Sequence, residues 1–161
     1  KDEENIMYWA RRKETEYYHK ICLEEGRKQL MPGAEKLLDY LKAEEIPINL
    51  CTASLDVNVD FYFKQLKLDR WFDRELVVYD DGINIDKKDM YLEGARRLNV
   101  DIGDVLIFDD SPTSIRKAVE AGCRNLVVIK KENNPDLKEI RQRITDFNEI
   151  DYELLKRVDE I

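Results

Sequence analysis

Two adjacent carboxylates follow an apolar run near the middle of the chain. The stretch "VLIFDDSPTSIRKAVEAG" covers residues 105–122 and places Asp109 and Asp110 directly after four apolar residues. Neighbouring carboxylates repel each other unless a cation or a proton intervenes, and hard oxygen ligands suit Mg²⁺. The acid pair is therefore a candidate metal site. The alternative is that Asp110 or Ser111 caps the helix that begins after Pro112.

Two other junctions between an apolar run and a helical pattern carry groups that can bind phosphate. Hydroxyl groups and the backbone N–H groups of a helix start form a natural phosphate cradle, and the first junction offers them at Thr52, Ala53 and Ser54. Lys87 and Lys88 open another helix, where a cation opposes the helix dipole unless an anion is nearby. Taken singly, a helix cap and two solvated lysines are the better explanations of these residues.

The elements that must position these residues alternate along the chain between strands and helices. Strands are expected at 47–54, 75–79, 105–108 and 125–129, with a short strand and a last helix in the tail. Helices are expected at 34–45, 86–100, 113–121 and 136–144, and another begins at about Asp56 and includes Val57 and Phe63. The strands are continuous apolar runs, which is typical of a doubly wound α/β domain with a parallel sheet covered on both faces. Ligands bind beyond the carboxyl ends of such strands, so Thr52 and Asp109 are expected at one edge.

The composition limits the classes of partner. The chain has 161 residues and a net charge of −8, which argues against a general binder of nucleic acid or of anionic membranes. No segment has the length and apolarity of a signal peptide or a membrane span. The three cysteines have no metal-type spacing, so we expect reduced thiols and a cytoplasmic location. A monomer is favoured, although the sequence does not fix the oligomeric state.

Four stretches taken together resemble the haloacid dehalogenase-like (HAD) hydrolases, in the branch of β-phosphoglucomutase and related phosphatases. They are "MPGAEKLLDYLKAEEIPINLCTAS", "LKLDRWFDRELVV", "KKDMYLEGARRLNV" and "DVLIFDDSPTSIRKAVEAGC", and they cover roughly residues 30–130. The resemblance implies a Rossmann-like core, Mg²⁺ as the cofactor and a small phosphorylated metabolite as the substrate. It implies Asp109 and Asp110 as metal ligands and Thr52, Ala53 and Ser54 as phosphate contacts. Either Lys87 or Lys88 would neutralise the phosphate charge.

The chain departs from the family pattern at three places. Ile85 stands where the family usually has its lysine, which leaves Lys87 and Lys88 open, and Ser114 stands where the fourth motif usually has glycine. The first motif, an Asp-x-Asp after a strand that supplies the nucleophile, has no match in residues 1–161. The resemblance implies that this motif lies upstream of Lys1.

The missing motif also defines the expected domains and the rival functions. Residues 1–29 resemble the end of a helical cap, and residues 30–161 form the α/β core without its first strand. The expected function is Mg²⁺-dependent phosphoryl transfer, as a phosphomonoester phosphatase or a sugar-phosphate mutase, through an aspartyl-phosphate. The alternative is a catalytically inactive HAD-like module for binding or scaffolding. A response-regulator receiver domain would share the acid pair, but too few residues follow Asp110 to complete that fold.

Overall fold

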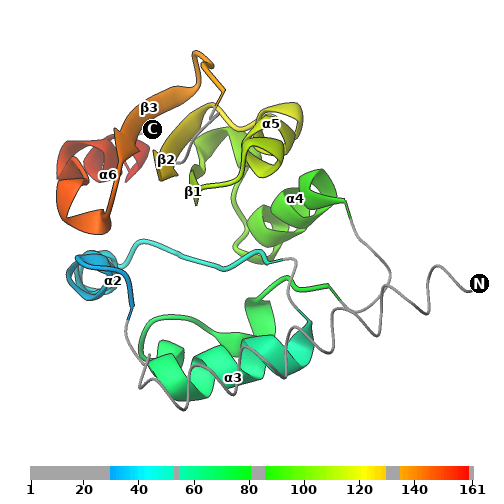
Figure 1. Ribbon diagram of the computed structural model, residues 1–161, viewed down its shortest axis with the longest axis vertical. Helices are drawn as coiled ribbons and strands as arrows, with labels where there is room; N and C mark the ends of the chain where they lie inside the picture. Colours follow the sequence, from blue (N-terminus) through cyan, green and yellow to red (C-terminus); the bar gives the residue numbers. More distant parts are fainter. Residues whose placement is uncertain (1–29, 53–54, 81–85, 130–134, 160–161) are drawn as a thin grey trace, which may run out of the picture.

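The computed structural model of the chain describes residues 30–52, 55–80, 86–129 and 135–159. In chain order the longer elements are α2 (Ala34–Ala43), α3 (Asp56–Leu66), α4 (Lys87–Arg97), β1 (Leu106–Asp109), α5 (Pro112–Glu120), β2 (Asn125–Ile129), β3 (Ile140–Ile144) and α6 (Tyr152–Asp159) (Figure 1). The cap remnant expected at 1–29 lies outside the described residues. Within them, no helix combines the length and the apolarity that a membrane span requires.

The centre of the domain is a parallel sheet with the strand order β1-β2-β3. β1 and β2 pair in register, with Leu106 opposite Asn125 and Asp109 opposite Val128. The apolar runs at 105–108 and 125–129 therefore form strands as expected, and the α/β class is confirmed. β1 lies at one edge of this sheet among the described residues, so its outer side faces the part of the domain that carries α2, α3 and α4 (Figure 1).

Helices cover both faces of the sheet, as a doubly wound domain requires. One apolar cluster joins Tyr91 of α4 and Ile115 of α5 to the strand residue Leu126. The other joins Leu37 of α2 and Leu155 of α6 to Val127 and its neighbours. Leu126 and Val127 are fully buried and are adjacent in β2, so they point to opposite faces of the sheet. This two-sided burial explains why the strands are continuous apolar runs.

The two remaining expected strands, at 47–54 and 75–79, form only a single bridge between Cys51 and Val78. The Thr52 N–H donates to the Val78 carbonyl at 2.9 Å, and the Val78 N–H donates to the Leu50 carbonyl at 3.0 Å. The strand expected over 75–79 is wrong in part, because Arg74–Leu76 is a short 3₁₀ helix. Each of these two segments pairs with the other through a single bridge, and one bridge is too little pairing to define long strands.

The helix expected at 136–144 is wrong, because Ile140–Ile144 is strand β3. The sequence "IRQRI" has three polar residues between two isoleucines, so it lacks the alternation of a strand, and Pro135 is typical of a helix start. The segment is a strand because it pairs in parallel with β2, which the local pattern does not encode. The last helix of the tail is confirmed as α6, and a 3₁₀ turn at Phe147–Glu149 stands where a short strand was expected.

Candidate active site at the edge of the sheet

Helix α4 joins the residues predicted to bind phosphate to the acid pair. The Lys87 ammonium donates to the Cys51 carbonyl at 2.9 Å, one residue before Thr52. One turn further along the same helix, the Tyr91 hydroxyl donates to Oδ2 of Asp109. The Lys87 ammonium also lies 5.1 Å from the centre of the Tyr91 ring. The predicted meeting of these segments at one edge is therefore observed, with α4 as the connection between them.

The Asp109 carboxylate is held by hydrogen bonds on both of its oxygens. Oδ1 accepts the backbone N–H groups of Asp110 at 2.7 Å and of Ser111 at 3.1 Å, while Oδ2 accepts the Tyr91 hydroxyl. Hydrogen bonds to both oxygens fix the direction of the carboxyl group. The Asp109 side chain is thus held in one orientation at the carboxyl end of β1.

The structure separates the acid pair from the helix cap. Ser111 is the N-cap of α5, and its hydroxyl accepts the Ser114 N–H at 3.5 Å. The cap alternative for Asp110 is therefore wrong. Among the described residues, no three His, Cys, Asp or Glu side chains gather closely enough to hold a metal ion, so Asp109 and Asp110 form at most two ligands of a site.

The first junction is described only in part. Thr52 is half-buried after the Cys51 bridge, whereas Ala53 and Ser54 lie outside the described residues. Helix α3 begins after Leu55, its N-cap residue, whose side chain makes no cap hydrogen bond. Because Ser54 lies outside the described residues, the alternative in which a hydroxyl of this junction caps α3 stays a prediction.

The two lysines differ in what they contact. The Lys87 ammonium lies against the Cys51 carbonyl, while Lys88 donates its backbone N–H to the Asp86 carboxylate at 2.8 Å. Asp86 is the N-cap of α4, as its sequence suggested, and it also pairs with Lys117 of α5 at 3.2 Å. Within the described part of the chain, Lys87 is the lysine whose ammonium contacts the edge that carries Thr52 and Asp109.

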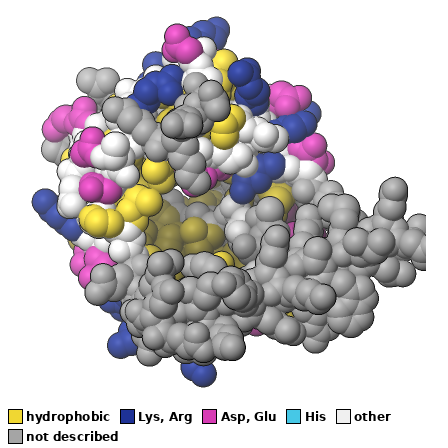
Figure 2. Space-filling model, viewed as in Figure 1, with side chains coloured by type: hydrophobic (Ala, Val, Ile, Leu, Met, Phe, Trp, Pro, Cys, Tyr) yellow, Lys and Arg dark blue, Asp and Glu magenta, His cyan; other side chains and the backbone are white. Residues whose placement is uncertain are grey.

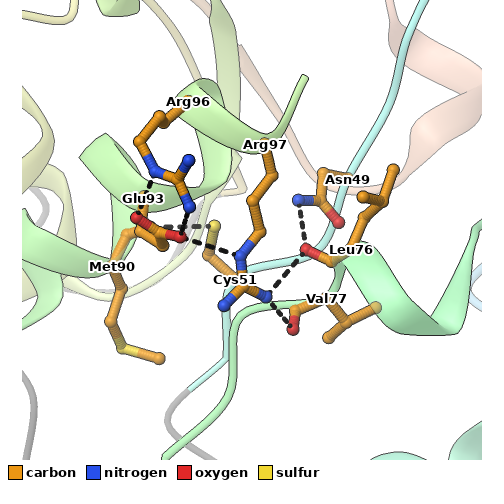
Figure 3. Close-up of polar contacts among 8 residues, drawn as sticks. All are labelled: Asn49, Cys51, Leu76, Val77, Met90, Glu93, Arg96 and Arg97. Carbon is orange, nitrogen blue, oxygen red and sulfur yellow. Dashed lines mark hydrogen bonds and ion pairs between the residues drawn. The ribbon is translucent and has the colours of Figure 1, made fainter. Parts of the chain in front are cut away.

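The other half of α4 is tied to the segment around Val77 (Figure 3). The Arg97 guanidinium donates to the carbonyls of Leu76 at 3.3 Å and of Val77 at 2.8 Å. Glu93 pairs with Arg97 at 3.0 Å and also with Arg96, and these hydrogen bonds lower the pKa of Glu93 to about 2. These hydrogen bonds and ion pairs occupy the Leu76 and Val77 carbonyls and hold α4 against this segment.

Cys51 lies between these two anchors. Its thiol donates to the Met90 carbonyl at 3.4 Å (Figure 3). Gly94 makes this close approach possible, since a Cβ at residue 94 would lie 2.5 Å from the Cys51 sulfur. Burial raises the pKa of the Cys51 thiol to about 11, against the opposing effect of Lys87 and Arg97. Cys51 is thus a neutral packing residue, as is the buried Cys123, and both are free thiols as expected.

An apolar cavity of 820 Å³ separates the Cys51–Val78 pair from β1. Its wall includes Leu50 on one side and Ile107 on the other, with Leu37, Phe63 and Phe108 around it. Figure 2 shows this recess as a hollow lined with hydrophobic side chains. Cys51 directs its own N–H and carbonyl away from Val78, because Leu50 and Thr52 supply the groups that pair with Val78. The sheet is therefore interrupted at the point where the candidate site lies.

Sequence reasoning missed the roles of Tyr91, Gly94 and Cys51. Tyr91 is only 6% exposed, although its hydroxyl reaches the sheet edge. Burial raises the pKa of Tyr91 far above its usual range, and the Asp109 charge raises it further, so the phenol stays a donor. The one signal for Tyr91 in the sequence was its spacing, because Tyr91 follows Lys87 by four residues and shares the same face of the helix.

Two curated relatives carry phosphatase names. The chain is 30% identical over 129 residues to the probable pseudouridine-5'-phosphatase of Drosophila melanogaster, covering 74% of this chain and 56% of that protein. It is 29% identical over 97 residues to the phosphorylated carbohydrates phosphatase of Thermotoga maritima, covering 59% of this chain and 44% of that protein. The chain therefore spans about half the length of these curated relatives.

A solved structure and a family model identify the fold. The crystal structure of a HAD hydrolase of family IA, variant 3, from Entamoeba histolytica superimposes with a TM-score of 0.82 at 26% identity, covering 98% of this chain and 72% of that one. The model of the family described as haloacid dehalogenase-like hydrolase matches residues 3–122, which include α4, β1 and the acid pair. The chain therefore belongs to the haloacid dehalogenase-like hydrolases.

Proposed function

We propose that the protein is a Mg²⁺-dependent phosphoryl-transfer enzyme acting on a small phosphorylated metabolite, as a phosphomonoester phosphatase or a sugar-phosphate mutase. The observation that carries this proposal is the Lys87 ammonium on the Cys51 carbonyl, on the same helix as Tyr91, which contacts Asp109. A cation and a carboxylate thereby flank one interrupted sheet edge. Both curated relatives named above are phosphatases by name, which supports a phosphate ester as the substrate.

The phosphate contacts would come from two junctions. The Thr52 hydroxyl and the backbone N–H groups and hydroxyl at Ala53 and Ser54 would donate hydrogen bonds to the phosphate at the start of the segment that leads into α3. Lys87 would neutralise its charge, because its ammonium already lies one residue from Thr52. In a site shielded from water, such a cation stabilises the charge that develops on the transferred phosphoryl group.

Asp109 and Asp110 fit a Mg²⁺ ion as donors, since both are carboxylates at a strand end and Ser111 fulfils the cap role without them. When bound, Mg²⁺ would polarise the phosphoryl oxygens and neutralise part of their charge. Asp109 and Asp110 would hold it, with Asp109 fixed by its three hydrogen bonds. Two carboxylates make a weak site alone, so a third oxygen ligand from another segment would complete it.

The nucleophile would be an aspartate upstream of Lys1, carried on a strand that fills the interruption in the sheet. Its carboxylate oxygen would attack phosphorus while the second Asp of the motif gives a proton to the leaving ester oxygen. Water, giving a proton to that same Asp, would then attack phosphorus, release phosphate and restore the nucleophilic carboxylate. The 820 Å³ cavity supports this proposal, because an apolar strand between Leu50 and Ile107 would both fill it and pair with β1.

The proposal is tested by comparing two versions of the protein on a generic phosphomonoester with Mg²⁺. Residues 1–161 alone should show negligible turnover, whereas a version extended at its N-terminus by the natural upstream segment should hydrolyse the ester. An Asp→Asn change at the first acid of the added segment should abolish turnover. If the natural upstream sequence encodes no strand ending in Asp-x-Asp, the inactive binding module becomes the better function.

A further inference from the structure

The Tyr91 hydroxyl links two motifs that lie far apart in the sequence. It donates to Oδ2 of Asp109, eighteen residues away, from a side chain that is 6% exposed. Burial keeps water from replacing this donor, so the Tyr91 hydroxyl holds Oδ2 of Asp109 in one direction. The remaining Asp109 oxygen is held by the Asp110 and Ser111 N–H groups, so the carboxylate is fixed at both ends.

Ser114 is the neighbour of the Tyr91 hydroxyl on α5. Its side chain opposes the rise in the pKa of Tyr91 that burial and the Asp109 charge cause. Ser114 lies in the first turn of α5, next to Ile115, which is fully buried. It is also the position at which this chain departs from the glycine that the family usually has. Tyr91 therefore lies between α5 and the end of β1, where it contacts Asp109.

We propose that Tyr91 is the positioning residue that orients the Asp109 carboxylate toward the cation site. Oδ1 of Asp109 already accepts two N–H groups, so Oδ2 is the oxygen with room for a further partner. The Tyr91 hydroxyl fixes the direction in which Oδ2 presents this remaining lone pair. The inference builds on the proposed cation site, but its first test does not require that a metal binds.

The first experiment measures amide hydrogen exchange of Asp110 and Ser111 by NMR in the metal-free protein. Tyr91→Phe removes the hydroxyl and keeps the ring, so the Asp109 carboxylate should loosen and both amides should exchange about 10-fold faster. Ser114→Ala, which removes the hydroxyl next to Tyr91, should give a smaller change in the same direction. The double variant should match Tyr91→Phe alone, because the Ser114 side chain can reach Asp109 only through the Tyr91 hydroxyl.

The matched control is Tyr40→Phe, on the other face of the sheet, where the ring packs against Tyr152 at 4.9 Å. This variant should leave the exchange of Asp110 and Ser111 unchanged. Unchanged exchange in Tyr91→Phe would overturn the positioning role. Equal acceleration in the control would also overturn it, since the effect would then be general loosening.

The second experiment measures Mg²⁺ affinity by calorimetry in the protein extended by its upstream segment. Tyr91→Phe should weaken Mg²⁺ binding about 10-fold, as loss of an orienting partner does in metal sites, while Tyr40→Phe should not. Faster exchange together with undiminished Mg²⁺ affinity would overturn the orientation toward the cation. Faster exchange in a protein that binds no Mg²⁺ would instead refute the proposed cation site and leave Tyr91 as a positioning residue of Asp109 alone.

Discussion

The Lys87 ammonium lies 2.9 Å from the Cys51 carbonyl, which points away from the Val78 bridge and into the interruption of the sheet. In a complete parallel sheet, a backbone N–H of the next strand would occupy this position. A side-chain cation there is placed at the edge where a nucleophile and a phosphate would meet. This contact distinguishes the position of Lys87 from that of Lys88, whereas the sequence alone left both lysines open.

The first prediction compares these two lysines in the protein extended by its natural upstream segment, which the proposed function expects to be active. Lys87→Ala should lower kcat/KM for a phosphomonoester about 100-fold or more, as does removal of other groups that stabilise transition-state charge. Lys88→Ala should change it by about twofold at most, because Lys88 contributes its backbone N–H to the Asp86 cap. Steady-state kinetics of both variants provide the test. Equal, small effects at both positions would contradict the assignment.

The second prediction concerns the acid pair and Mg²⁺. Asp110→Asn should weaken Mg²⁺ binding in a calorimetric titration by more than about 10-fold, because removal of a ligand should exceed the effect of removing an outer partner. The double Asn variant should bind more weakly still. Asp104→Asn is the matched control, since Asp104 is an exposed acid that pairs with Arg124 at 3.6 Å. Equal binding by the double variant and the unchanged protein would remove the metal role from both acids.

Part of this site followed from the sequence and part could not. The run 105–108, the Ser-Pro start and Gly122 predicted β1 and α5 because each is a local signal, and Gly122 adopts the φ of 105° that favours glycine after a helix. The contact between Tyr91 and Asp109 depends on how α4 packs against β1, which no local pattern encodes. The choice of Lys87 over Lys88 likewise depends on the direction in which α4 leaves Asp86.

The third prediction tests the close packing of α4 on Cys51. Gly94→Ala places a Cβ 2.5 Å from the Cys51 sulfur, so the free energy of unfolding should fall by about 1–3 kcal/mol despite the better helix propensity of alanine. Adding Cys51→Ala removes the sulfur and should restore most of this loss. Gly103→Ala is the control, because its Cβ meets the end of the exposed Arg124 side chain. Urea unfolding provides the measurement, and failure of Cys51→Ala to rescue would locate the strain elsewhere.

The fourth prediction concerns acid stability through Glu93. Hydrogen bonds from Arg96 and Arg97 lower the pKa of Glu93 to about 2 in the folded protein, below the ordinary value of 4.5. Such a group stabilises the fold above its unfolded pKa, and this contribution is lost as the pH falls from about 4.5 toward 2. Glu93→Gln should therefore reduce stability at pH 7 and lose its effect near pH 2.

Urea unfolding of both proteins between pH 2 and pH 7 tests this window. Glu35→Gln serves as the comparison, since Glu35 is an exposed acid that pairs with Arg70 at 3.6 Å. An exposed ion pair contributes little, so this variant should lose less stability at pH 7 than Glu93→Gln. A constant difference between Glu93→Gln and the unchanged protein across the whole range would show that Glu93 acts through packing and not through its charge.

The last prediction concerns the apolar cavity beside β1. Residues 1–161 retain 820 Å³ of space between Leu50 and Ile107, and such apolar surface binds a hydrophobic dye such as anilinonaphthalene sulfonate. Fluorescence of this dye should therefore rise with the 161-residue chain and fall when the upstream strand is added. The strand would bury the cavity wall and pair with the open edge of β1, so unfolding should also become more cooperative. As a control, an added segment whose apolar strand residues are replaced by serine should neither displace the dye nor sharpen the transition. Equal dye binding with and without the natural strand would show that it does not occupy this cavity, and the nucleophile would then have to reach Lys87 and Asp109 by another path.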